Sequence, residues 1–142
     1  MSDSKVLSET LIKEHVHNFC NALAGRHLET LSTLLLDDAV LFWGPYVFKG
    51  KERILTWAQE LHDLFPFMTF KEKTLVVAES SAKHEFLIAF IATQGQKGWL
   101  PCEGIYEFQK DRIRHLKIKV LHGFLAVNRD DVDRVKPHGL KQ

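Results

Sequence analysis

The sequence has few of the residues that mark secreted, metal-binding or membrane proteins. It holds only two cysteines, Cys20 and Cys102, and both stand among regularly spaced apolar residues. We interpret them as two buried thiols of a cytoplasmic protein rather than as a disulfide or a redox pair. No apolar run approaches the length of a membrane span, and the first twenty residues lack the apolar core of a signal peptide. We therefore expect a cytoplasmic protein with no membrane partner.

A large excess of either charge is also missing. Lysine and arginine number 19 and aspartate and glutamate 18, so the net charge is +1 with histidine neutral. No overall electrostatic field then draws the protein to nucleic acid. A nucleic-acid surface would need a dense basic patch with exposed aromatic residues, and Lys97 beside Trp99 is thin evidence for one. We expect no nucleic-acid partner.

What the sequence does contain is the composition of one soluble globular domain. Hydrophobic residues make up 45% and charged residues 26% of the 142 residues, which are ordinary values for such a domain. This length buries a real core but is too short for two comfortable domains. We predict a single domain over residues 1–142, with its core at 8–122 and a C-terminal tail at 123–142. The charged stretch 128–136 is predicted to add one helical turn.

The first half of the chain has the apolar spacing of helices. Three helical segments are predicted, over residues 8–25, 28–35 and 51–65. Gly25 is placed to end the first helix in a left-handed conformation, and Pro66 ends the third. The pair Asp37-Asp38 is predicted to turn the chain into a short apolar strand at 39–43, which Gly44-Pro45 closes.

The second half alternates apolar and polar residues with a period of two. Strands are predicted over residues 67–78, 84–94, 99–109 and 112–121. The last two form a hairpin around the polar turn at 109–111, in which one face of each strand is apolar. A sheet with one apolar face needs a cover, and the helices lie upstream. We therefore predict an α+β fold, with N-terminal helices packed on a strongly curved antiparallel sheet that encloses an internal pocket.

Several short motifs follow one another at characteristic spacing between residues 8 and 122. They are Asn21-Ala22-Leu23, Leu36-Asp37-Asp38-Ala39-Val40, Gly44-Pro45, Gly50-Lys51-Glu52-Arg53-Ile54, Phe65-Pro66, Tyr106-Glu107-Phe108 and Asp111-Arg112-Ile113. This arrangement resembles the nuclear-transport-factor-2-like (NTF2-like) cone fold, in particular its SnoaL-like and ketosteroid-isomerase-like group. The resemblance implies a cone-shaped α+β barrel. The group includes isomerases, cyclases, dehydratases, epoxide hydrolases and non-catalytic binding modules, so the fold alone does not select a function.

The catalytic groups of the ketosteroid isomerases are missing from this sequence. In those enzymes a tyrosine and a protonated aspartic acid form the oxyanion hole, and a second aspartate is the base. The corresponding positions are Phe19, Gly104 and Trp43, none of which supplies the required side-chain donor or base. The resemblance therefore implies no ketosteroid isomerase activity. The paired carboxylates and arginine of the cone-fold epoxide hydrolases find no convincing match either.

The same correspondence with the cone-fold enzymes predicts an apolar and aromatic wall around the pocket. Such a wall suits a small apolar or aromatic cyclic molecule held by a few polar contacts. The alternative is that these side chains simply fill the cone as core. The predicted ligand-binding residues are Phe19, Trp43, Trp57, Leu87, Ala89, Ile91, Cys102, Gly104, Leu116, Ile118 and Val120.

Two side chains are candidates for chemistry in this pocket. His15 lies on the buried face of the first predicted helix, where burial favours a neutral imidazole that can act as a base. Tyr106 is expected to hydrogen-bond an oxygen of the substrate. The alternative for His15 is a core histidine bonded to a backbone carbonyl. No metal and no cofactor is predicted, because no histidine pair shares a predicted face with carboxylates.

Three classes of function remain open. The first is a SnoaL-like enzyme (an isomerase, cyclase or dehydratase), the second a non-catalytic binding module, and the third a dimeric interaction protein with a filled cone. The polar face of the last hairpin carries Ile105 and Leu121 among charged residues that pair across the strands. We expect a homodimer through this face.

Overall fold

A computed structural model describes residues 8–65, 67–91, 95, 97–121 and 140–141. The turn predicted at 128–136 lies outside these residues. The helices are α1 (Glu9–Gly25), α2 (Leu28–Leu34) and α3 (Lys51–Leu64). The strands are β1 (Leu35–Trp43), β2 (Tyr46–Lys49), β3 (Thr69–Ala78), β4 (Ser81–Ile91), β5 (Lys97–Gln109), β6 (Arg112–Val120) and β7 (Leu140–Lys141).

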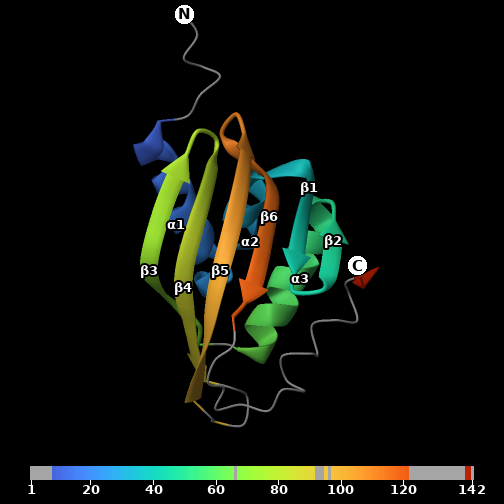
Figure 1. Ribbon diagram of the computed structural model, residues 1–142. Coiled ribbons are helices and arrows are strands. Elements are labelled where there is room, and N and C mark those ends of the chain that lie inside the picture. Colours follow the sequence, from blue (N-terminus) through green and yellow to red (C-terminus); the bar gives the residue numbers. More distant parts are fainter. Residues whose placement is uncertain (1–7, 66, 92–94, 96, 122–139, 142) are drawn as a thin grey trace, which may run out of the picture.

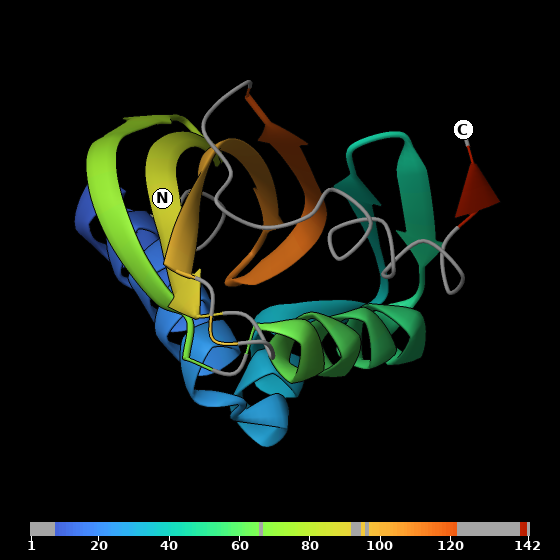
Figure 2. The ribbon, with the colours of Figure 1, turned by 90° about the horizontal axis from the view of Figure 1, so that it is seen from below.

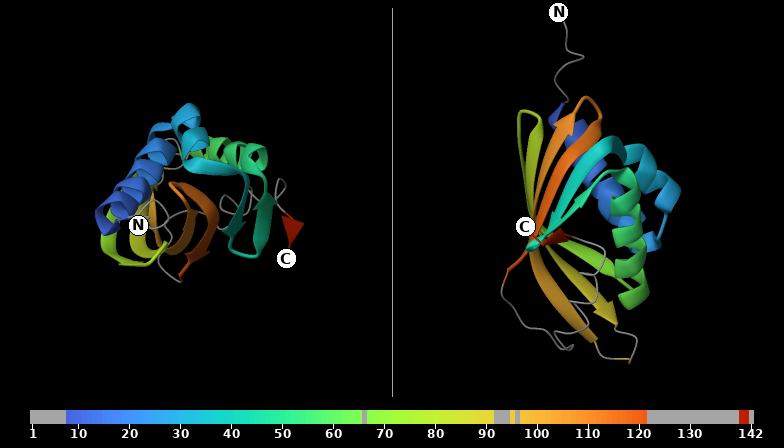
Figure 3. Two further views of the ribbon diagram at one scale, coloured as in Figure 1. Left: turned by 90° about the horizontal axis from the view of Figure 1, so that it is seen from above. Right: turned by 90° about the vertical axis from the view of Figure 1, so that its right-hand side faces the viewer.

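All strands belong to one sheet in the order β3-β4-β5-β6-β1-β2-β7. The helices cover one face of this sheet (Figures 1 and 2), and the sheet bends strongly around them (Figure 3). We call the covered face the inner face and the opposite one the outer face. The predicted α+β architecture is confirmed. The sheet is mostly antiparallel, and the exception is β1, which pairs in parallel with β6.

The helices form where the apolar spacing predicted them. Ser8 caps α1, because its side-chain oxygen accepts a hydrogen bond of 3.0 Å from the backbone N–H of Leu11. The face of α1 that carries Ile12 and Phe19 is buried against the sheet. Trp57 and Leu61 are fully buried on α3, and each such side chain contributes roughly 1.5–3 kcal/mol of hydrophobic stabilisation.

The left-handed residue that ends α1 is Arg26, with φ 61°, and not the predicted Gly25. Gly25 is still the last helical residue. A Cβ atom at Gly25 would lie 2.6 Å from the ring of His27. The absence of a side chain at Gly25 therefore lets the ring of His27 lie close to the end of the helix. The strained left-handed conformation is adopted by Arg26, which has a side chain.

Replacing Arg26 with glycine is expected to raise the free energy of unfolding by up to about 1 kcal/mol, because glycine adopts positive φ without steric cost. The lost ion pair to Asp63, 3.5 Å long and on the surface, offsets little of this. The matched control is Lys13→Gly inside α1, which should lower the same free energy by about 1 kcal/mol. Urea denaturation of the three proteins measures both effects. Destabilisation by Arg26→Gly would contradict the strain.

Two boundaries around β1 differ from prediction. Asp37 and Asp38 lie inside the strand, which already begins at Leu35 because that residue pairs with Ile113 of β6. The strand β2 was not predicted. The pair Gly44-Pro45 closes a tight hairpin in which Trp43 pairs with Tyr46, and the four residues of β2 are too few to show a clear period.

The strand β4 is shifted by one residue from its predicted face. Leu87, Ala89 and Ile91 were predicted to point inward, but they are only partly buried and lie on the outer face. The residues buried on the inner face are Ala82, His84, Phe86, Ile88 and Phe90. The run from Phe86 to Ile91 is apolar on both faces, so its own alternation cannot set the register.

Candidate functional site

Most of the predicted wall lies on the inner face. Trp43, Cys102, Gly104, Leu116 and Ile118 are buried there, and Val120 is partly buried. Phe19 on α1 and Trp57 on α3 are buried on the helices that cover this face. The indole of Trp57 packs between two other aromatic rings, with centroids 5.6 Å from Trp43 and 6.4 Å from Phe48. Its Nε1 has no hydrogen-bond partner among the described residues.

Gly104 lies under two aromatic rings. A Cβ atom there would lie 3.3 Å from Cε1 of Tyr106 and 3.4 Å from Cε1 of Phe86. A carboxylic acid at this position, which the ketosteroid isomerase pattern requires, would therefore need these rings to move. The rings of Tyr106 and Phe86 therefore occupy the space that the acid side chain would need.

Tyr106 is 1% exposed and points into the interior from β5. Its ring meets the edge of Phe19 at a centroid distance of 6.0 Å. Its hydroxyl lies 3.8 Å from Sγ of Cys20 on α1. This is a long contact to a weak partner, so the hydroxyl remains available for a better acceptor or donor.

Sequence reasoning missed His84, which is 2% exposed and is the buried charged or polar residue of the described core. It points inward from β4 because its neighbours Lys83 and Glu85 point outward. Its Nδ1 lies 4.0 Å from Sγ of Cys20. Its Nε2 lies 3.1 Å from Oε1 of Glu72 on β3. A buried imidazole thus connects the interior thiol to a half-exposed carboxylate.

The carboxylate of Glu72 fixes how the imidazole is protonated. An ionised carboxylate only accepts hydrogen bonds. Nε2 of His84 therefore carries the ring proton and donates a hydrogen bond to Glu72. Nδ1 of the neutral ring then presents a lone pair toward Cys20 and the interior. His17 on α1 reaches the same oxygen of Glu72 at 2.7 Å. We call these five residues the relay: Tyr106, Cys20, His84, Glu72 and His17.

The protonation states follow from burial and charge. Burial lowers the pKa of His84, although the charge and hydrogen bond of Glu72 oppose this shift. Burial of Glu72 acts to raise its pKa, but hydrogen bonds and charges from His17 and His84 lower it overall. Burial raises the pKa of Cys20 to about 12 and that of Tyr106 well above 10. At neutral pH the interior groups are thus uncharged, and Glu72 is ionised.

These shifts predict a loss of stability in acid. The pKa of His84 lies below 6.5 in the folded protein and that of Glu72 below 4.5, so the unfolded chain takes up both protons first. The free energy of unfolding should therefore fall as pH drops below 6.5, and again below 4.5. Urea denaturation across this range measures it. His84→Gln should flatten the first fall, whereas His27→Gln, on an exposed residue, should not.

His15 lies apart from the relay. Its ring stacks on Phe108 at a centroid distance of 6.0 Å, whereas Phe19, one helical turn later, contacts Tyr106. Both ring nitrogens of His15 are buried and have no hydrogen-bond partner among the described residues. The backbone-bonded alternative is therefore not what the structure contains. The part of His15 in chemistry stays a prediction.

One signal in the sequence points to His84. Lys83 and Glu85 are charged residues on either side of it, and charged side chains on one strand face indicate that the residue between them faces inward. The strand predicted at 84–94 begins three residues after Ser81, the first residue of β4, and so leaves out the start of this alternation at Ala82. The turn between β3 and β4 is in fact Glu79-Ser80.

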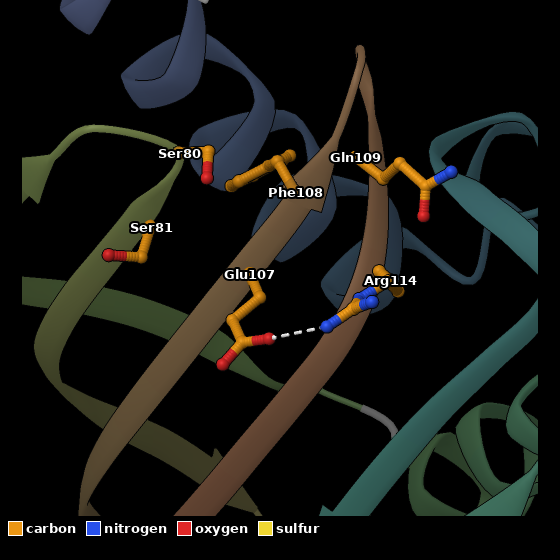
Figure 4. Close-up of a pocket in the computed structure, with 6 residues that line it drawn as sticks. All are labelled: Ser80, Ser81, Glu107, Phe108, Gln109 and Arg114. Carbon is orange, nitrogen blue, oxygen red and sulfur yellow. Dashed lines mark hydrogen bonds and ion pairs between the residues drawn. The ribbon is translucent and has the colours of Figure 1, made fainter. Parts of the chain in front are cut away.

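Two hollows lie on the surface. One, of about 360 Å³, lies at the tips of β4, β5 and β6 and contains the 3.4 Å ion pair between Glu107 and Arg114 (Figure 4). The other, of about 460 Å³, runs across β3, β4 and β5, and its lining includes Lys71, Leu87 and Leu121. Within the part of the chain that the structure describes, no cluster of three metal-binding side chains occurs. No described helix is long and apolar enough to cross a membrane.

Proteins of known structure share this architecture. A LEH-like epoxide hydrolase from M. tuberculosis superimposes with a TM-score of 0.69 at 18% identity, over 92% of this chain and 92% of that one. A proposed SnoaL-like polyketide cyclase from Jannaschia sp. CCS1 gives 0.71 at 11% identity, over 84% and 88%. An NTF2-like protein from Anabaena variabilis ATCC 29413 gives 0.70 at 14% identity, over 80% and 89%. The chain has the NTF2-like cone fold.

The resemblance seen in the sequence is thus confirmed at the level of the fold. No protein-family model and no curated protein matches the chain. Identities of 11–18% to these three structures do not carry an activity from one cone-fold protein to another. The function has to be argued from the relay.

Proposed function

We propose that this cone-fold protein is a SnoaL-like enzyme that binds a small apolar or aromatic cyclic molecule and moves a proton on it. The reaction class is isomerisation, cyclisation or dehydration that begins with removal of a proton beside a carbonyl group. The observation that carries the proposal is the buried imidazole of His84, held by Glu72 with its free nitrogen toward the thiol of Cys20, which in turn contacts the hydroxyl of Tyr106.

The geometry divides the chemical roles. His84 takes the substrate proton on Nδ1, and the imidazolium that forms is stabilised by the ionised carboxylate of Glu72. Tyr106 donates its O–H to the substrate oxygen on which negative charge develops. The same proton returns to another atom of the substrate, or leaves with a departing hydroxyl as water. These roles replace the predicted pair of His15 and Tyr106 with His84 and Tyr106.

The surroundings of the relay favour an uncharged substrate. Phe19 and Phe86 pack against Tyr106 and His84, with ring centroids 6.0 Å and 4.7 Å apart. Cys20 joins the two polar groups only through contacts of 3.8–4.0 Å, and a substrate oxygen forms shorter and stronger hydrogen bonds than a thiol does. A charged group would be costly to bring into this site.

Hydrogen exchange on a model ketone tests the proposal. β-Tetralone, an aromatic cyclic ketone, is incubated in D2O with the protein, and loss of its α-proton signals is followed by NMR. We expect exchange faster than in buffer and faster than with His84→Gln, and His27→Gln should exchange as the unchanged protein does. Native mass spectrometry of freshly purified protein should show a retained small molecule. Exchange no faster than buffer, together with no retained molecule, would overturn the proposal.

We further propose that two copies pair through the outer face. Its apolar residues include Val76, which is 61% exposed, and Ile105, which is 41% exposed. Both lie directly opposite Lys83 of β4, Val76 on β3 and Ile105 on β5. Glu85 and Glu103 lie opposite each other in the next outward row, and Glu103 forms an ion pair of 3.4 Å with Lys83 of the same chain. A two-fold axis can bring Lys83 of one copy against Glu85 of the other.

The dimer gives a testable prediction. Sedimentation at tens of micromolar is expected to show a single dimeric species, and Ile105→Glu should convert it to monomer because two added carboxylates would meet across the axis. Gln59→Glu is the control, because it adds a carboxylate at an exposed position of α3, away from the outer face. A monomer for the unchanged protein at this concentration would sink the proposed interface.

A further inference from the structure

We propose that His17 is a positioning residue that sets the base strength of His84 through the carboxylate the two histidines share. This inference rests on the proposed function, because it assigns a role within the same site. It concerns a histidine on the surface side of the relay, to which neither the sequence nor the cone fold gives a role.

The geometry is a competition for one oxygen atom. Nε2 of His17 lies 2.7 Å and Nε2 of His84 3.1 Å from Oε1 of Glu72. The shorter contact belongs to the outer histidine, so His17 has the better hydrogen bond of the two. An oxygen that accepts two N–H donors offers less electron density to each than it would to one. His17 therefore weakens the hold of Glu72 on His84.

The two histidines differ in exposure. The side chain of His17 is 49% exposed, whereas that of His84 is 2% exposed. His17 exchanges protons with the solvent directly, and His84 meets the solvent through Glu72. When His17 gains a proton, its positive charge lies in a ring whose centroid is 6.5 Å from that of His84. A charge at that distance disfavours a second imidazolium.

The titratable groups that face His84 come from three elements. These are His17 and Cys20 on α1, Glu72 on β3 and Tyr106 on β5. The thiol and the phenol stay uncharged at neutral pH because burial raises the pKa of each. Glu72 and His17 are therefore the two groups whose charge acts on His84 near neutrality, and they act in opposite directions.

The arrangement gives the enzyme a base that stays free at low pH. Glu72 alone would favour the imidazolium of His84, and a protonated His84 cannot abstract a proton. His17 counteracts this effect by sharing the carboxylate oxygen as a hydrogen-bond donor. When His17 is protonated, its positive charge acts in the same direction. The charge of a protonated His17 therefore holds back protonation of His84.

The test is a titration of the His84 ring followed by NMR in the full-length protein, which needs no activity. His17→Leu removes both the N–H donor and the charge, and the titration of His84 should move to higher pH. His17→Gln keeps an N–H donor without the charge, so it should move the titration by a smaller amount in the same direction. Glu72→Gln should move it to lower pH. His27→Gln is the matched control and should leave it unchanged.

The rate of α-proton exchange on β-tetralone supplies the second readout. In His17→Leu the acid limb of its pH profile should shift to higher pH together with the NMR titration of His84. A His84 titration that does not move in His17→Leu would overturn the inference, even if the protein is active. A titration that moves in a protein without exchange activity would support the coupling and remove only the proposed function.

Discussion

The exchange of β-tetralone α-protons is expected to slow by about 10²–10⁴-fold when His84 is replaced by glutamine, because general-base catalysis by a positioned side chain contributes roughly this factor. Glutamine fills a similar volume and can still donate a hydrogen bond to Glu72, but it cannot take a proton from the substrate. The fold should survive, since β4 keeps its backbone pairing with β3 and β5. Circular dichroism and the NMR exchange rate are measured on the same sample.

Tyr106→Phe provides the companion measurement. It removes the hydroxyl and keeps the ring that packs on Phe19, so exchange should slow by roughly 10²–10³-fold, the usual effect of losing one oxyanion donor. Cys20→Ala should slow it far less, because the thiol has neither role. If Cys20→Ala abolishes exchange while His84→Gln does not, the roles assigned to the relay are wrong.

The largest loss of stability is expected for Trp57→Ala. Trp57 is fully buried between Trp43 and Phe48, and truncating such a side chain typically costs about 3–5 kcal/mol. The cost combines lost hydrophobic burial with the cavity that the neighbouring rings leave unfilled. Urea denaturation monitored by circular dichroism gives the change in the free energy of unfolding.

Two controls separate volume from polarity at this position. Trp57→Phe keeps much of the ring and removes the buried Nε1–H that has no partner among the described residues, so it should cost well under half as much as alanine. Phe67→Ala removes a ring that is 67% exposed and should change the free energy by no more than about 0.5 kcal/mol. Equal losses for alanine and phenylalanine at position 57 would contradict a cost that arises from packing.

The fold was predictable because its signals are long and repeated. The helical spacing on α1 and α3 and the alternation in β5 and β6 extend over enough residues to fix both element and face. Where a signal is short or divided, prediction failed. The four residues of β2 show no clear period, and Leu35 belongs to β1 because of a parallel partner, Ile113, that lies far away in the sequence.

The site was harder to predict because it depends on a register. Tyr106 was placed correctly on the inner face, since the alternation of its strand is clear. The histidine predicted for the pocket is His15, because the helical spacing of α1 places it on the buried face of that helix. A shift of one residue turns His84 outward and Leu87 inward in the predicted strand. Only the pairing of β3, β4 and β5 brings Glu72, His84 and Tyr106 together.

The parallel pairing of β1 with β6 has a consequence for synthesis of the protein. The hairpin of β1 and β2 is made early, yet it joins the long strands through β6, near the end of the described core. A chain emerging from the ribosome therefore carries Leu41 and Trp43 with no β6 strand to pair with until residues 112–120 have left the exit tunnel. Long-range pairings of this kind slow folding and leave apolar edges open to other chains. Truncation before β6 is thus expected to give an aggregating fragment rather than a smaller domain.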